Sequence, residues 1–187
     1  TGKPGLLMGQ GLWIGTNAGF GIVESYLAGS PMLIVSDLSD YNSLSQFGPY
    51  QNSNGEYGAV DLPSMMRSMT KYTTVASTPS EFIHGVQLAI KHATTGRPGP
   101  ACVLIKSAVS YSKIDPELAN PKFYPLAGYM NTSPPTISEG DAEKAAKMLT
   151  AAANPVIIAG TGIHRGKAYQ ELKDLAETLG APVATSY

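Results

Sequence analysis

Two short glycine-containing segments are the parts of this chain best suited to hold a small molecule. The first spans residues 15–19, Gly-Thr-Asn-Ala-Gly, and its candidate contacts are Gly15, Thr16 and Asn17. Backbone N–H groups at a helix start can bind an anion or a polar ring edge, and small residues let a ligand approach the backbone. A plain helix cap, with glycines that serve packing, also explains these residues. Both interpretations stay open.

The second segment is Gly160, Thr161 and Gly162, which follows an apolar strand expected over residues 155–159. A glycine bend between a strand and a helix can bring the helix N-terminus to a diphosphate. The next glycine is Gly166, so the third glycine of the dinucleotide fingerprint is not cleanly in place. A nucleotide-binding turn and a simple connecting turn are both compatible with this pattern.

The other side chains of catalytic type do not form a set. His84, His92 and His164 are scattered, and no carboxylate or cysteine joins them at metal-ligand spacing, so we predict no metal site in this chain. Asp37 and Asp40 bracket the end of an expected strand, where they could pair as acid and base or belong to a solvated loop. The residue types alone therefore indicate an α/β ligand-binding or assembly fragment.

A long aperiodic segment, residues 37–58, is the irregular part with the most functional character. It is rich in aromatic residues and poor in charge, which is typical of loops that cover a pocket or an interface. The lone cysteine, Cys102, lies in an apolar run, and we predict a buried and unreactive thiol.

Composition excludes several classes of function. The 187 residues are 43% hydrophobic and 14% charged, and the net charge of −1 argues against bulk electrostatic binding to nucleic acid or to a membrane surface. Lys3 is the only basic residue before Arg67, so we predict that this stretch is mostly buried or faces a partner chain. We predict a cytoplasmic location. Both chain ends look like cuts through folded sequence.

Strands and helices alternate along the chain, which predicts an α/β fold with parallel sheets. The expected strands cover residues 5–8, 31–35, 71–75, 101–105, 155–159 and 182–185. The expected helices run from Thr16 or Asn17 to Ala28, from Asp61, over 78–95 after a capping box, from Ser138, and over 166–179. The strand at 5–8 is expected in the interior of its sheet. Five prolines mark residues 107–137 as a linker.

Six motifs in order resemble acetolactate synthase and its thiamine-diphosphate-dependent relatives, which include pyruvate oxidase and the 2-hydroxyacyl-CoA lyases. The resemblance covers nearly the whole chain. The motifs are Thr-Gly-Lys-Pro-Gly at 1–5, Thr-Asn-Ala at 16–18, Ser-Pro-Met-Leu-Ile-Val at 30–35, Thr-Lys at 70–71, Gly-Arg-Pro-Gly-Pro at 96–100 and Asn-Pro-Val-Ile-Ile at 154–158.

The resemblance implies a domain organisation and a set of cofactors. Residues 1–106 would be the later part of a pyrimidine-binding domain, 107–137 a linker, and 138–187 the start of a Rossmann-like central domain. Thr16 and Asn17 would lie near the thiazolium end of thiamine diphosphate. Gly160–Gly162 would face FAD or ADP, although some members hold no nucleotide there. The activating glutamate would lie upstream of Thr1, and the Mg²⁺ ligands outside this chain.

The implied chemistry is the cleavage or formation of a C–C bond beside a carbonyl, in a lyase or transferase that is a homodimer or homotetramer. The substrate would be a small 2-oxo acid, 2-hydroxy ketone or acyl compound, and this fragment alone would be inactive. The alternative is a non-catalytic FAD- or ADP-binding or regulatory module of the same superfamily.

Three segments depart from the acetolactate synthase pattern. Residues 12–14 are Leu-Trp-Ile where the family has Gly-Pro-Gly, which puts an indole near the cofactor. Residues 57–59 replace Phe-Gln-Glu, and residues 106–108, Lys-Ser-Ala, replace Pro-Lys-Asp. These changes favour the superfamily over acetolactate synthase activity itself.

Overall fold

The computed structural model describes residues 3–38, 53–56, 58–114, 124–125, 130 and 136–186. The chain has an α/β fold and divides into two compact units, Thr1–Asn131 and Thr132–Tyr187. Each unit contains parallel strands and helices, as the alternating pattern predicts. The aromatic segment at 37–58 lies largely outside the described residues, and so does most of the expected linker.

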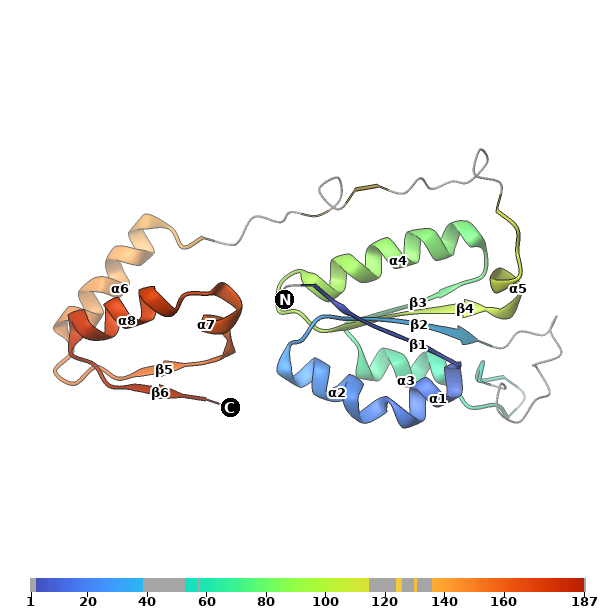
Figure 1. Ribbon diagram of the computed structural model, residues 1–187, viewed down its shortest axis with the longest axis horizontal. Coiled ribbons are helices and arrows are strands. Elements are labelled where there is room, and N and C mark those ends of the chain that lie inside the picture. The colour runs from blue at the N-terminus through green and yellow to red at the C-terminus, as the bar shows by residue number, and fades with distance from the viewer. Residues whose placement is uncertain are drawn as a thin grey trace. The chain divides into compact units, whose positions relative to one another are not determined.

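The first unit is built on a four-stranded parallel sheet with the order β1-β2-β4-β3 (Figure 1). Its strands are β1 (Gly5–Gly9), β2 (Met32–Leu38), β3 (Tyr72–Ala76) and β4 (Pro100–Lys106). All four agree with the predicted strands to within one to three residues at each end. Among the described strands β1 pairs with β2 alone, so the interior position expected for the first strand stays a prediction for the longer protein.

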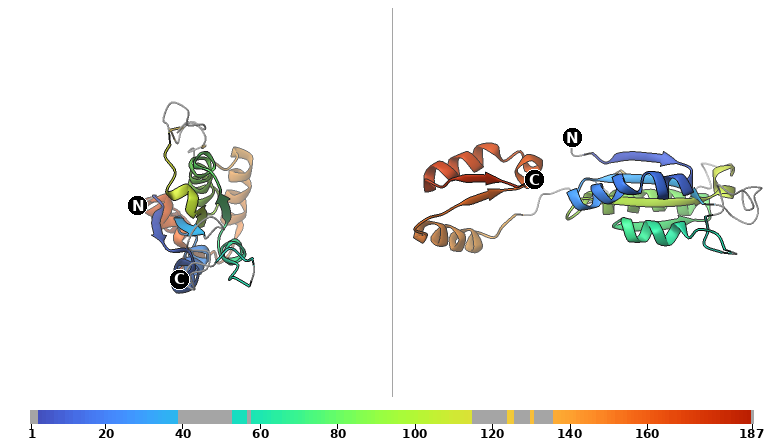
Figure 2. Two further views of the ribbon diagram at one scale, coloured as in Figure 1. Left: turned by 90° about the vertical axis from the view of Figure 1, so that its right-hand side faces the viewer. Right: turned by 90° about the horizontal axis from the view of Figure 1, so that it is seen from below.

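Helices cover both faces of this sheet (Figures 1 and 2). On one face, α1 (Gly11–Asn17), α2 (Gly19–Ala28) and α3 (Leu62–Met69) enclose a core. That core contains Ile14, Ile22, Ile34, Leu38, Leu62, Met66, Cys102 and Leu104. On the other face, α4 (Pro79–Thr94) packs Ala89 and Ala93 on Ala76, Ala101 and Val103. Alternate β4 residues face opposite layers, which explains its continuous apolar sequence.

The uncovered part of the sheet lies along β1. Leu6 and Met8 are 63% and 64% exposed, whereas the intervening Leu7 packs against the first core. The right-hand view of Figure 2 shows β1 at the margin of the sheet. Helix α2 also leaves Phe20 86% exposed and Leu27 63% exposed. These exposed apolar side chains agree with the low charge of this half of the sequence.

Local capping signals place most helix ends correctly. Thr78 accepts a hydrogen bond from the Glu81 N–H at 3.2 Å and starts α4. Asp61 starts α3, and its two hydrogen bonds from Ser64 lower the pKa of the carboxyl below its usual value. Gly29 ends α2 in the left-handed conformation, with φ of 63°.

The helix predicted from Thr16 or Asn17 to Ala28 does not begin at either of these residues. Residues 11–28 form α1 and α2 in succession, and Ala18 occupies the junction between them. Thr16 and Asn17 therefore lie in the last turn of α1 and do not cap the second helix. The strand-to-helix turn is at Gln10, five residues before the segment expected to form it.

Short helix α5 (Ser107–Ser110) follows β4 directly, with Ser107 and Val109 buried. The predicted linker therefore begins with ordered structure that belongs to the first unit. The second unit contains α6 (Glu139–Ala151), β5 (Ile157–Ala159), α7 (Thr161–Gly166), α8 (Tyr169–Leu179) and β6 (Val183–Thr185). Strands β5 and β6 pair in parallel. Ser138 caps α6 and Gly180 ends α8, as predicted. The helix predicted over 166–179 begins at Tyr169.

Candidate functional site

The carboxyl ends of the parallel strands define the candidate site of the first unit. After β2 the chain continues to α3 on one face of the sheet, and after β3 it continues to α4 on the other face. Strand β4 lies between β2 and β3. The connections that follow β2 and β3 thus lead to helices on opposite faces of the sheet, and in open α/β sheets ligands bind at the carboxyl ends of strands where connections diverge in this way.

The turn from β1 to α1 at this edge is fixed by two side chains of β2. Ser36 Oγ donates to the Gly9 carbonyl at 2.6 Å, and the Gly11 N–H donates to Asp37 Oδ1 at 2.7 Å. Asp37 is partly buried and Ser36 is buried. The Asp37 carboxylate is therefore engaged with the backbone. Its predicted partner, Asp40, lies outside the described residues, so the acid–base pair stays a prediction.

Helix α1 carries the first set of predicted cofactor contacts. A Cβ on Gly15 would lie 2.5 Å from Leu62 Cδ1, so the missing side chain of Gly15 serves the packing of α1 on α3. Thr16 is exposed, and its hydroxyl donates to the Leu12 carbonyl at 2.8 Å. The exposed Asn17 makes no side-chain hydrogen bond with any residue that the structure describes. Thr16 and Asn17 thus have exposed polar side chains, whereas Gly15 is buried, and the role of all three in binding a cofactor stays a prediction.

Trp13, which the family resemblance would place near the cofactor, also lies on α1, and this residue is 45% exposed.

The second set of predicted contacts lies in the other unit. Gly160 immediately precedes α7, which begins at Thr161, and no side chain caps this helix. Gly162 is exposed, and a Cβ built there would meet nothing within 4 Å. The packing of the unit therefore does not require glycine at position 162. An open surface at this turn is compatible with a ligand, as the predicted role needs.

The Gly-Arg-Pro-Gly-Pro turn at 96–100 has a structural role. Lys71 Nζ donates to the carbonyls of His92, Thr95 and Arg97 at 2.7, 3.0 and 2.6 Å. These carbonyls lie at the end of α4 and in the turn that follows it. The Arg97 guanidinium in turn donates to the Leu27 carbonyl in the last turn of α2. Two basic side chains thus satisfy carbonyls that helix ends leave without partners.

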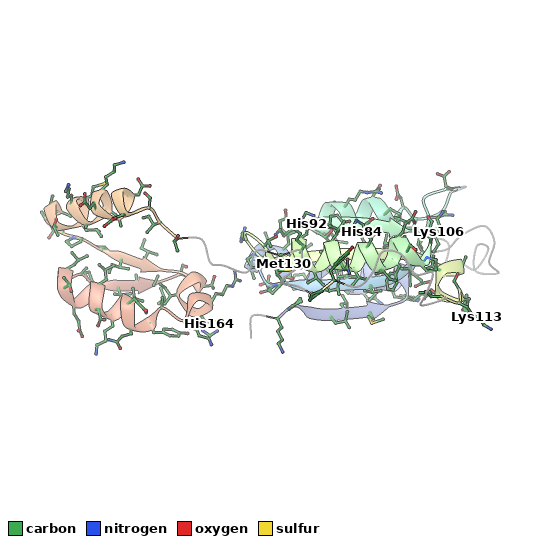
Figure 3. The ribbon with its side chains drawn as sticks, turned by 90° about the horizontal axis from the view of Figure 1, so that it is seen from above. His84, His92, Lys106, Lys113, Met130 and His164 are labelled. Carbon is green, nitrogen blue, oxygen red and sulfur yellow. The ribbon has the colours of Figure 1, made fainter. Side chains whose placement is uncertain are left out.

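The three histidines belong to no cluster of potential metal ligands among the residues described. Figure 3 labels His84 and His92 on α4, and His164 in the other unit. The His92 ring stacks on Tyr72 with ring centroids 4.5 Å apart, and His164 Nδ1 hydrogen-bonds to Tyr169. No group of three potential metal ligands occurs among the residues described.

Burial raises the pKa of the Cys102 thiol to about 12. We expect Cys102 in the folded chain to resist alkylation by iodoacetamide at pH 8, because the thiolate is the reactive form and is scarcely populated. Mass spectrometry should show one added carbamidomethyl group only after the chain is unfolded in guanidinium chloride. Stoichiometric labelling of the native chain within minutes would contradict the buried, inert thiol.

Sequence reasoning missed two features of the carboxyl edge. The bond from Gly11 to Asp37 joins residues 26 positions apart. Lys106 ends β4 at the same edge of the sheet, and the sequence revealed it only as a departure from a family pattern. A polar or charged residue directly after a buried strand drew attention to Asp37, and the same signal could have identified Lys106.

Among the described residues, no helix combines the length and the apolar character that crossing a membrane requires.

Comparison with known proteins gives matches over the whole chain. The family model described as "Thiamine pyrophosphate enzyme, central domain" matches residues 142–187. Sulfoacetaldehyde acetyltransferase of Alcaligenes xylosoxydans xylosoxydans is 30% identical over 187 residues, which are 100% of this chain and 28% of that protein. The acetolactate synthase large subunit of Corynebacterium glutamicum is 27% identical over 186 residues, again 100% of this chain and 28% of the relative.

A third relative, from an archaeon, covers slightly less of the chain. The probable acetolactate synthase large subunit of Methanocaldococcus jannaschii is 30% identical over 173 residues, 91% of this chain and 27% of the relative. The chain thus spans little more than a quarter of the length of these curated relatives.

Proposed function

Since this chain belongs to the superfamily of thiamine-diphosphate enzymes that includes acetolactate synthase, we propose that it is part of an enzyme that cleaves or forms a C–C bond beside a carbonyl. The observation that carries the proposal is the similarity of the entire chain to two kinds of enzyme, acetolactate synthase and sulfoacetaldehyde acetyltransferase. A lyase or transferase that acts on a 2-oxo acid or a related 2-hydroxy ketone or acyl compound fits both names.

The two units suggest different parts of such an enzyme. We assign residues 1–106 to the later part of a pyrimidine-binding domain and residues 138–187 to the start of the central domain. The match of the central-domain model to residues 142–187 supports the second assignment. The parallel sheet, whose connections lead to helices on opposite faces, supports a ligand-binding role for the first.

This chain's own residues would bind and orient rather than react. When bound, thiamine diphosphate supplies a carbanion that adds to a carbonyl and accepts the electrons of the broken C–C bond. Thr16 and Asn17 would present a hydroxyl and an amide to the cofactor from the last turn of α1. Asp37 and Ser36 hold the turn that starts this helix. Gly160–Gly162 would contact FAD or ADP in the second unit.

The remaining parts of the proposal concern the longer protein. We propose a homodimer or homotetramer, which agrees with the exposed apolar residues Leu6, Met8 and Phe20. The ligands of Mg²⁺ and the activating glutamate would both lie outside this chain. The 187-residue chain alone is therefore expected to be inactive. The cytoplasmic location stays a prediction from the sequence.

The test is to express the longer protein and titrate it with thiamine diphosphate and Mg²⁺ by calorimetry, then assay pyruvate consumption. We expect saturable binding and turnover, and an Asn17→Ala variant should weaken cofactor binding while its melting temperature stays unchanged. A protein that binds no thiamine diphosphate and consumes no 2-oxo acid refutes the proposal. If that protein still binds FAD or ADP, the non-catalytic nucleotide-binding module is the correct function.

A further inference from the structure

We propose that Asn54 is a site of deamidation, in which the Gly55 backbone nitrogen attacks the side-chain amide, and that the product loosens the start of α3. No other asparagine in the sequence precedes a glycine. Because glycine has no Cβ, it hinders the attacking nitrogen less than any other residue does. The inference concerns the stability of the first unit and does not rest on the proposed function.

The reaction needs water and no other co-reactant. A bond forms between the Gly55 nitrogen and Cγ of Asn54, and the bond from Cγ to Nδ2 breaks. The side-chain nitrogen leaves as ammonia, which carries the proton lost by the Gly55 N–H. Water then opens the resulting cyclic imide at one of its two carbonyl carbons. One opening gives aspartate, and the other gives isoaspartate, in which the main chain passes through Cβ.

The structure requires glycine at position 55. Gly55 has φ of 84°, in the region that residues with a Cβ rarely adopt, and a Cβ built there would lie 2.9 Å from Asp61 Cγ. Gly55 is exposed and Asn54 is half-buried, so water reaches the pair. The fold therefore keeps a reactive dipeptide at a position where no bulkier residue could shield it.

Hydrogen bonds restrain both reacting groups while this turn is closed. The Gly55 N–H donates to the Val60 carbonyl at 3.1 Å, which holds the attacking nitrogen. Asn54 Oδ1 accepts the Glu56 N–H at 3.0 Å, which holds the side chain in one orientation. The nitrogen reaches Cγ only after the turn opens locally, so the rate of deamidation measures how often it opens.

Asn54 is linked to the start of α3 by an antiparallel bridge to Asp61. The Leu62 N–H donates to the Ser53 carbonyl at 3.0 Å beside this bridge, so Asn54 and Asp61 form a pair of the non-hydrogen-bonded type, in which side chains approach most closely. Asp61 in turn accepts the N–H and the hydroxyl of Ser64 at 3.0 and 2.6 Å. A change at Asn54 therefore acts directly on the residue that caps the helix.

Both products disturb this arrangement. Aspartate at position 54 places a second negative charge opposite Asp61, and like charges directly opposite each other destabilise a strand pair. Isoaspartate adds one atom to the main chain, so the bridge and the bonds beside it no longer match. Leu62 and Met66 of α3 are both 0% exposed in the core, and a loosened start of α3 would bring apolar surface into water.

The direct test is to incubate the 187-residue chain at mildly alkaline pH in water enriched in heavy oxygen, once native and once in guanidinium chloride, and to map its peptides by mass spectrometry. We expect the peptide with Asn54 to gain the mass of an acid that contains the heavy oxygen, as aspartate and as isoaspartate. The native chain should react about tenfold or more slowly than the unfolded chain, because hydrogen bonds must break first.

Asn17 is the internal control, because it is exposed and precedes Ala18 instead of a glycine. It should react more slowly than Asn54 in both samples. An Asn54 side chain that stays intact in the native chain for as long as Asn17 does overturns the proposal. Equal rates for Asn54 in the native and the unfolded chain also count against it, because the hydrogen-bonded turn would then offer no protection.

Variants separate the effect of the product from the rate of its formation. Asn54→Asp should lower the melting temperature by a few degrees, and Asp61→Asn, which keeps a capping oxygen without the charge, should remove most of this loss when the two are combined. Asn54→Ser retains an acceptor for the Glu56 N–H and cannot form the imide. Its melting temperature should stay constant during the incubation that lowers that of the wild type. A melting temperature for Asn54→Asp equal to that of the wild type overturns the effect on α3.

Discussion

Replacement of Gly11 by alanine is expected to destabilise the first unit by about 3 kcal/mol or more, because the new methyl group has no space. A Cβ at this position would lie 2.2 Å from the Asp37 carbonyl oxygen and 2.8 Å from Leu62 Cδ2. The leucine side chain can move, but the carbonyl belongs to β2, which pairs with a strand on each side. The variant must therefore displace the start of α1 and lengthen the bond from the Gly11 N–H to Asp37.

Gly21→Ala is the matched control for this prediction. Gly21 is exposed in α2, and a Cβ there would meet nothing within 4 Å. Alanine stabilises a helix interior relative to glycine by up to about 1 kcal/mol. Urea unfolding followed by circular dichroism should thus show opposite shifts for the two variants. A midpoint for Gly11→Ala equal to that of the wild type would show that β2 and α1 are not held as the structure describes.

Lys71→Met is expected to cost about 2 kcal/mol of folding free energy, because it removes one donor group from three carbonyls at the end of α4. Part of the loss is recovered, since Lys71 is exposed and water can reach the freed carbonyls. The aliphatic stem also packs on the turn, where a Cβ on Gly99 would lie 2.8 Å from Lys71 Cδ. Methionine retains much of this packing and tests the donor alone.

Lys91→Met is the control, because Lys91 is an exposed lysine in the last turn of α4 whose side chain makes no described hydrogen bond. Thermal unfolding should show a melting temperature several degrees lower for Lys71→Met and a change near zero for Lys91→Met. If both variants lose the same stability, the effect comes from charge near the helix terminus and not from the three hydrogen bonds.

The strands and the capping residues of this fold are predictable from sequence because they depend on near neighbours. Thr78, Asp61 and Ser138 each accept a hydrogen bond from a residue three positions ahead. The division of residues 11–28 into two helices was missed, because Thr16 and Asn17 are good caps by residue type, yet the packing of Gly15 against Leu62 keeps them inside α1.

The candidate site depends on contacts that sequence spacing does not encode. Asp37 on β2 accepts a hydrogen bond from Gly11, 26 residues earlier at the start of α1, and Lys71 reaches carbonyls 21 to 26 residues away. The glycine segments were found because small residues are recognisable by type. The residue type alone did not distinguish their roles. Gly15 is required by packing and Gly162 has open space around it, yet the two glycines look identical in a sequence.

The open margin of β1 has a consequence for handling the chain. This strand presents unpaired backbone groups together with Leu6 and Met8, and among its five residues, Gly5–Gly9, there is no charge or proline. Edges of this kind pair with other chains unless something covers them. Aggregation through this edge, in addition to the stability of the fold, will therefore limit the concentration at which the 187-residue chain can be kept in solution. A lysine at position 6 or 8 is the smallest change that would discourage edge-to-edge aggregation.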